Sequence, residues 1–141
     1  MMRNILILLL VSGVVANASF SRSGDIVTDN VTGLEWQDNS DAKDKELKWR
    51  EAIDYCEALN LGGYSDWRLP NINELKSIVD RDRYNPAIVS KFTNISSNYY
   101  WSSSTHKYDL SNAWRVNFKY GSVSNLTKDY SHYVRCVRAG E

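Results

Sequence analysis

Two cysteines are the side chains whose chemistry the sequence constrains most. Cys56 and Cys136 are the only two in 141 residues. In an exported chain an even pair predicts a disulfide, here one that closes a long loop between a helical segment and the last strand. The alternative is a pair of free or metal-binding thiols, although two cysteines without histidines at ligand spacing make a poor metal site.

Residues able to carry nucleophilic, acid–base or metal chemistry are few. The two histidines, His106 and His132, fall in polar segments expected to be loops, and no Gly-x-Ser-x-Gly sequence frames a serine near them. Asp38, Asp41 and Asp44 are spaced by three in an acidic segment, without the alternating ligands and central glycine of an EF-hand. We therefore expect no catalytic residues, no metal and no cofactor.

A pair of loops, at residues 103–112 and 124–132, is the better candidate for a site. Their amide, charged and aromatic side chains suit recognition of a ligand, and binding residues concentrate on loops held by a rigid scaffold. The alternative is that both are ordinary solvated turns. The candidate ligand-binding residues are His106, Lys107, Tyr108, Asp109, Asn112, Asn125, Lys128, Asp129, Tyr130 and His132.

The five tryptophans suggest stacking on sugar rings, but burial is the simpler interpretation. Large aromatic side chains dominate small hydrophobic cores, and Trp49 and Trp114 fall on apolar stripes of their elements. We expect most of the five to be core residues. They are Trp36, Trp49, Trp67, Trp101 and Trp114.

The segment 62–75 predicts a helix end, a turn and a new helix start. Gly62-Gly63 suits the positive φ that stops a helix, and Pro70 suits the approach to one. Asn71 and Glu74 have the spacing of a capping box. A partly buried Arg68 needs a partner, and Asp66 and Glu74 are the nearest acids. We expect structural roles for Trp67, Arg68, Pro70, Asn71 and Glu74.

The hydrophobic pattern predicts two helices among short strands. Helical periodicity covers residues 47–60, with Cys56 on the apolar stripe, and about 72–80. Short strands at 26–27 and 34–37 flank a hairpin turn, and alternation after residue 98 predicts strands at 99–102, 113–118, 122–126 and 133–138. Residues 38–45 are expected to be a solvated loop and 81–98 irregular. This order predicts an α+β class with a mostly antiparallel sheet.

The N-terminus has the pattern of a signal peptide. Arg3 precedes an apolar run from Ile5 to Val15, and Ala16-Asn17-Ala18 has the small-x-small form of a cleavage site. We expect residues 1–18 to be removed, leaving 19–141 as one domain in the periplasm, on the outer surface or in the medium, with no membrane span. The alternative is a membrane anchor, for which the apolar run is short.

The charge balance argues against a general nucleic-acid binder, since 17 basic residues face 17 acidic ones. Residues 100–141 are mildly basic, with six basic residues against three acidic ones. A sulfated polysaccharide is therefore one candidate partner, and its binding would weaken with salt.

Taken together, the motifs resemble the Lcl C-terminal domain family, a bacterial family of largely unknown function. The matching segments run in order through nearly all of residues 19–141. They are 32–36, 49–52 with 55–56, 61–75 around Trp67-Arg68-Leu69-Pro70, 100–103, 113–118 with Gly121, and 133–138.

The resemblance implies a C-type-lectin-like fold, related to the formylglycine-generating-enzyme group: two helices packed on a mostly antiparallel sheet with long loops. It also implies a disulfide between Cys56 and Cys136. Some members of the family sit at the end of collagen-like surface adhesins and are associated with binding sulfated polysaccharides. This chain has no Gly-x-y tract, so the stalk of those adhesins is missing from it.

These observations predict an exported, non-enzymatic recognition domain that binds a glycan or a protein partner at the bacterial cell envelope or surface. The two C-terminal loops are the expected contact region. One alternative is an enzyme or enzyme remnant on the formylglycine-generating scaffold, which would need reactive, unpaired thiols. Another is a structural component of the envelope or of a surface appendage.

Overall fold

Two sheets and three short helices make up the part of the chain described by the computed structural model, residues 19–140. The signal peptide expected over residues 1–18 lies outside the described residues. The first sheet has the order β1 (Phe20–Ser23), β2 (Ile26–Asp29), β3 (Glu35–Gln37) and β9 (Val137–Arg138). The second has the order β4 (Glu46–Leu47), β8 (His132–Tyr133), β5 (Tyr99–Thr105), β6 (Asn112–Asn117) and β7 (Ser122–Thr127).

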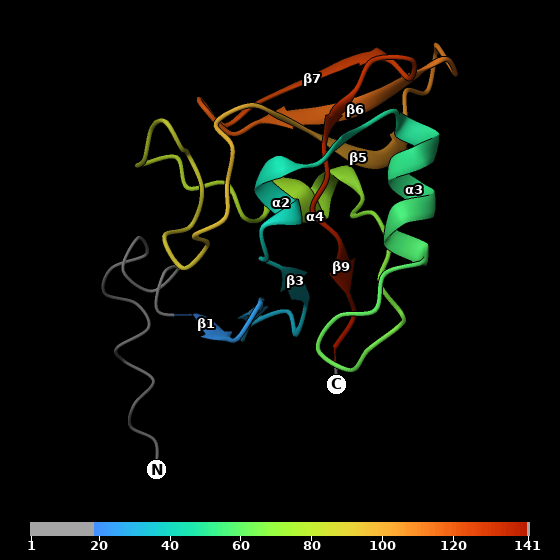
Figure 1. The fold of residues 1–141 in the computed structure, drawn as a ribbon. Helices are drawn as coiled ribbons and strands as arrows, with labels where there is room; N and C mark the ends of the chain where they lie inside the picture. Colours follow the sequence, from blue (N-terminus) through green and yellow to red (C-terminus); the bar gives the residue numbers. More distant parts are fainter. Residues whose placement is uncertain (1–18, 141) are drawn as a thin grey trace.

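The pairing confirms the α+β class and the mostly antiparallel sheets, since only β5 and β8 run parallel among the described strands. β5, β6 and β7 lie at one end of the molecule and β1, β3 and β9 at the other, with α2 (Asp41–Asp44) and α4 (Ile72–Lys76) between them (Figure 1). The longest helix, α3 (Trp49–Glu57), packs beside β5. The fold thus places the end of β5, the start of β6 and the end of β7 near the start of α3.

The second expected helix is shorter than its apolar stripe suggested. α4 ends at Lys76 because the next residues pair with a distant segment instead of extending the helix. Val89 N donates to the carbonyl of Ile78 at 3.1 Å, and Val79 forms a β-bridge with Ile88. The apolar side chains of residues 78–79 were therefore correctly predicted to face the core, but in the wrong element.

Residues 38–45 are not the solvated loop that their charges suggested. α2 lies within them, and the Ala42 side chain is completely buried. The hydroxyl of Tyr100 in β5 donates to the carbonyl of Ala42 at 2.5 Å. This contact fixes α2 against the larger sheet.

The last expected strand, 133–138, is divided between the two sheets. Its start belongs to β8 in the second sheet and its end to β9 in the first, and Cys136 lies between them. The sequence prediction of one continuous strand was wrong, because a single stretch of alternating residues gives no sign that its partner changes.

The disulfide between Cys56 and Cys136 is present, with 5.5 Å between the two Cα atoms. It joins α3 to the segment that links the two sheets. A cross-link across a separation of 80 residues stabilises the fold by about 4–5 kcal/mol in the chain-entropy model. The link therefore fixes the helix against both sheets at one point.

Three of the five tryptophans are core residues. Trp36 and Trp101 are fully buried and Trp67 nearly so. Trp49 and Trp114, expected to be buried from their apolar stripes, are only partly buried. Both lie beside the candidate loops, at the start of α3 and in β6.

Candidate functional site

The segment around Arg68 has the structural role that the sequence predicted. Both Nη atoms of Arg68 donate to the two carboxylate oxygens of Glu74, at 2.7 and 2.8 Å. Glu74 and Asn71 also form the expected capping box of α4. Trp67 is buried and donates from its indole N–H to the carbonyl of Leu61 at 3.3 Å. Of the two acids considered for Arg68, Glu74 is the partner.

Asp66 pairs elsewhere. Its carboxylate accepts from Nε of Arg138 at 2.6 Å, and Glu35 accepts from the same guanidinium at 2.5 Å. These two acids raise the pKa of Arg138 above its usual range, the hydrogen bond that Arg138 donates to Asp66 being the larger cause. The pair ties residue 66 to β9, so this acid acts in holding the sheet and not in holding Arg68.

The two candidate loops meet at one end of the β6–β7 hairpin. We call residues 106–111 and 128–131 the loop tip. The ammonium of Lys128 donates to the hydroxyl of Thr105 at 3.0 Å and to the carbonyl of Leu110 at 2.9 Å. It also lies 3.9 Å from the centre of the Trp49 ring. Lys128 is therefore the residue that joins both loops to α3.

Other predicted site residues hold the tip in shape. Nδ1 of His106 accepts hydrogen bonds from the backbone N–H groups of Tyr108 and Asp109, at 3.1 and 3.2 Å. The His106 ring stacks on Trp114, with 5.1 Å between centroids. Asn112 donates to Asn125 across the hairpin at 2.9 Å. The tip is thus a preformed surface and not a pair of independent turns.

The outer face of the tip is formed by large exposed side chains. Tyr108 is 84% exposed, Leu110 71% and Tyr130 57%. Sequence reasoning included the two tyrosines but missed Leu110. The sequence did contain a signal for it, a leucine in a polar segment expected to be a loop. A large apolar side chain in such a loop has no core to enter and is therefore expected to be exposed.

His132 does not belong to this group. It lies in β8, is only 9% exposed and packs against Trp101 with 4.4 Å between ring centroids. Its Nε2 lies 3.1 Å from Nη1 of Arg115. Burial first, and the charge of Arg115 second, lower the pKa of His132 to about 4. Sequence reasoning placed it in a polar loop; the structure makes it a neutral, buried imidazole.

The mild positive charge of residues 100–141 does not gather on the surface. Arg135 and Arg138 are buried in ion pairs. The guanidinium of Arg115 lies 3.7 Å from the centre of the Tyr99 ring, and Lys128 is engaged within the tip. Lys107 is exposed there, together with Asp109 and Asp129. The tip therefore presents both signs of charge.

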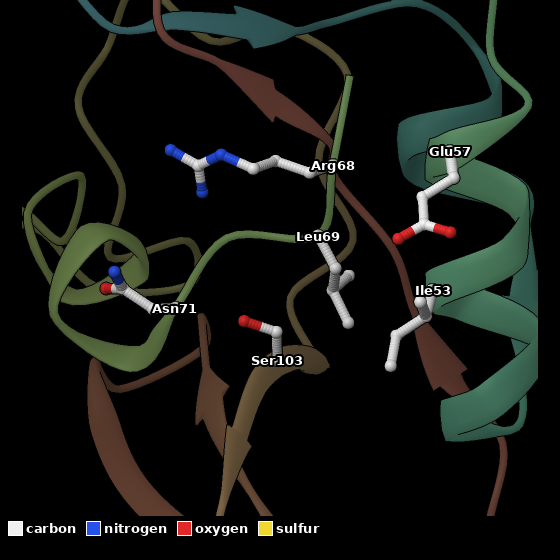
Figure 2. A pocket seen from close by; sticks show the side chains of 6 residues that line it. All are labelled: Ile53, Glu57, Arg68, Leu69, Asn71 and Ser103. Atoms are coloured by element: carbon white, nitrogen blue, oxygen red, sulfur yellow. The ribbon is translucent and has the colours of Figure 1, made fainter. Parts of the chain in front are cut away.

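A pocket of about 380 Å³ lies elsewhere, between α3 and the segment leading into α4. Figure 2 shows Ile53 and Glu57 of α3 on one side and Leu69 on the other, with Ser103 of β5 below. Arg68 and Asn71 complete the lining. This pocket was not predicted from the sequence, because its residues come from three separate segments and share no motif.

Neither a metal centre nor a membrane span is found among the described residues. In the range 19–140 no three histidine, cysteine, aspartate or glutamate side chains are grouped to hold a metal ion. The carboxylate of Asp38, one of the three aspartates spaced by three in the sequence, accepts hydrogen bonds from Asn94 and Arg135. None of the helices within those residues has the length and apolar character needed to cross a bilayer.

Comparison with known protein families identifies the class. The model of the Lcl C-terminal domain matches residues 25–138, which is most of the chain and includes both cysteines. The chain therefore belongs to the Lcl C-terminal domain family. No curated protein matches it.

Proposed function

We propose that this protein is an exported recognition domain of the bacterial cell envelope or surface, with a C-type-lectin-like fold, that binds a glycan or a protein partner through the loop tip. One observation carries the proposal: Lys128 holds two loops and α3 together at a tip that exposes three large side chains. A rigid surface loses little conformational freedom on binding, which favours affinity.

The exposed groups suit recognition by contact and stacking. Tyr108 and Tyr130 offer aromatic faces with a polar end, a combination enriched where proteins bind partners and one that also stacks on sugars. Since Lys107 and Lys128 are balanced by Asp109 and Asp129, ion pairing with a polyanion is a smaller part of this interaction. A sulfated polysaccharide remains a partner to test, through the salt dependence of its affinity.

A non-enzymatic role is supported by the state of the cysteines. The enzyme alternative requires an unpaired, reactive thiol, and both sulfur atoms are joined in the disulfide. The same disulfide favours an oxidising compartment outside the cytoplasm. Export, in turn, agrees with the leader expected from the sequence.

Paired substitutions at the two ends of the β6–β7 hairpin test the proposal. The variant Tyr108→Ser with Tyr130→Ser alters the tip. Its control, Tyr84→Ser with Tyr120→Ser, removes two other exposed tyrosines at the opposite end, whose rings are 5.6 Å apart. We expect the tip variant to lose binding on a glycan array and in a pull-down from envelope extracts, while the control retains it. Equal binding by both variants, or no partner for the folded wild type, would count against the proposal.

A further inference from the structure

The pocket beside α3 has a chemistry of its own, and none of the tip residues line it. Ile53 and Leu69 give it apolar walls, and Ser103 adds a hydroxyl. Glu57, one helical turn after Ile53, adds a carboxylate. Both side chains line the pocket because residues four apart share a face of a helix. The pocket thus pairs a short apolar surface with an acidic group.

The charges in this pocket do not cancel. The guanidinium of Arg68 is already held by both oxygens of Glu74, and Figure 2 shows it pointing away from α3. Glu57, in contrast, forms no ion pair with any residue in the range 19–140. Its carboxylate extends into the space between α3 and Leu69 (Figure 2). The net charge facing a ligand is negative.

We propose that this pocket binds a primary ammonium group carried on a short aliphatic chain, as the lysine side chain of a partner peptide provides. Glu57 is the counter-ion, the hydroxyl of Ser103 is an acceptor, and Ile53 and Leu69 pack against the methylene groups. A long basic side chain commonly places its stem on apolar surface in this way while its charge stays in water. A volume of about 380 Å³ is near the lower end for ligand pockets, which suits one side chain better than a chain of sugars.

The direct test is an NMR titration of the full chain, purified in its oxidised form, with n-butylammonium chloride at constant ionic strength. The amide signals of Ile53, Leu69 and Ser103 are the readout, and n-butanol is the neutral probe of matched size. Glu57→Gln keeps the shape of the side chain and removes its charge. Asp54→Asn makes the same charge change on an exposed residue of α3 that does not line the pocket.

We expect saturable shifts at these three residues with butylammonium and none with butanol. Glu57→Gln should weaken the affinity roughly fivefold, the upper end of what an exposed ion pair contributes, and Asp54→Asn by less than about twofold. Equal shifts with butanol, an unchanged affinity in Glu57→Gln, or the absence of any shift would overturn the proposal.

Two further probes distinguish between a peptide and an amino sugar as the source of the ammonium group. Nα-acetyl-lysine methylamide should reproduce the butylammonium shifts, because its side chain carries the same ammonium group on the same four-carbon stem. Glucosamine carries an ammonium on a sugar ring, and tighter binding of glucosamine would overturn the peptide as the source. All variants lie outside the loop tip, so failure here leaves the proposed function standing, and failure of the tip experiment leaves the pocket standing.

Discussion

Nη1 of Arg135 lies 2.8 Å from Oδ1 of Asp38, and both side chains are completely buried. Asp38 also accepts hydrogen bonds from the backbone N–H groups of Thr93 and Asn94, at 3.0 and 3.1 Å, and from Arg22. Burial alone would raise the pKa of Asp38, but the charge of Arg135 and the hydrogen bonds from Thr93 and Arg22 outweigh it and hold that pKa below its usual range. The pair joins the end of β3 to the segment between β8 and β9.

Asp38→Asn should destabilise the protein severely. The amide keeps the shape of the side chain but leaves the buried guanidinium of Arg135 without its counter-charge, which costs about 3–5 kcal/mol when one partner of a buried pair is lost. Urea unfolding followed by tryptophan fluorescence measures the change. Asp25→Asn, at an exposed turn residue, is the control and should stay within about 0.5 kcal/mol. A loss below about 1 kcal/mol in Asp38→Asn would contradict the role given to this pair.

Stability should fall as the pH is lowered from about 7 to about 4, and His132 should be a main cause. Its pKa is about 4 in the folded protein and about 6.5 in an unfolded chain. Between these values the unfolded chain binds more protons, so acidification favours unfolding. The contribution of neutral His132 to the free energy of unfolding is complete above the pKa of the unfolded chain. It is lost as the pH falls to the pKa of the folded protein, and it amounts to about 3 kcal/mol at most.

The His132 contribution can be separated from that of Asp38. Because the pKa of Asp38 is lowered, its contribution is lost only as the pH falls below the unfolded pKa of an aspartate, about 3.9. Thermal unfolding of the wild type and of His132→Gln at pH 7, 5.5 and 4.5 therefore isolates the imidazole. The variant should show the shallower dependence on pH; the same slope in both proteins would exclude His132 as the cause.

Lys128→Met should loosen the loop tip, whereas Lys107→Met should not. The first change keeps the aliphatic stem but removes the hydrogen bonds to Thr105 and Leu110, each with a net value of about 1.5–3 kcal/mol for a charged group. Lys107 is exposed and lies 5.3 Å from the centre of the Tyr108 ring. Hydrogen exchange of residues 106–111 is the measurement. Equal protection in the two variants would mean that Lys128 does not hold the tip.

Features that depend on residues close in the chain were predicted well. Asn71 and Glu74 are three residues apart, so the capping box was visible in the sequence, as was the turn of the β2–β3 hairpin that contains Gly33. Cys56 and Cys136 are far apart, but they were the only pair available. The family resemblance, which also depends on other motifs, implied the same disulfide.

Features that depend on distant partners were not predictable in this way. Nothing near His132 indicates that Arg115 and Trp101 will enclose it, and nothing near Lys128 indicates that its ammonium will lie over Trp49. Asp38 looked solvated because its neighbours are polar, while the donors that bury it come from residues 93–94 and 135. The sequence therefore identifies which side chains are charged, but not whether each charge lies in water or in the interior.

The division of residues 132–138 between both sheets has a consequence for biosynthesis. β8 lies between β4 and β5, and β9 completes the first sheet at β3. The chain must therefore be synthesised as far as Tyr133 before the second sheet has all its strands, and as far as Arg138 before the first sheet has all of its own. Until then β4 lacks its only neighbour, β8, and β3 is paired on one side only, with β2. Both sheets are thus expected to be completed together, once this last segment has been synthesised, and not strand by strand along the chain.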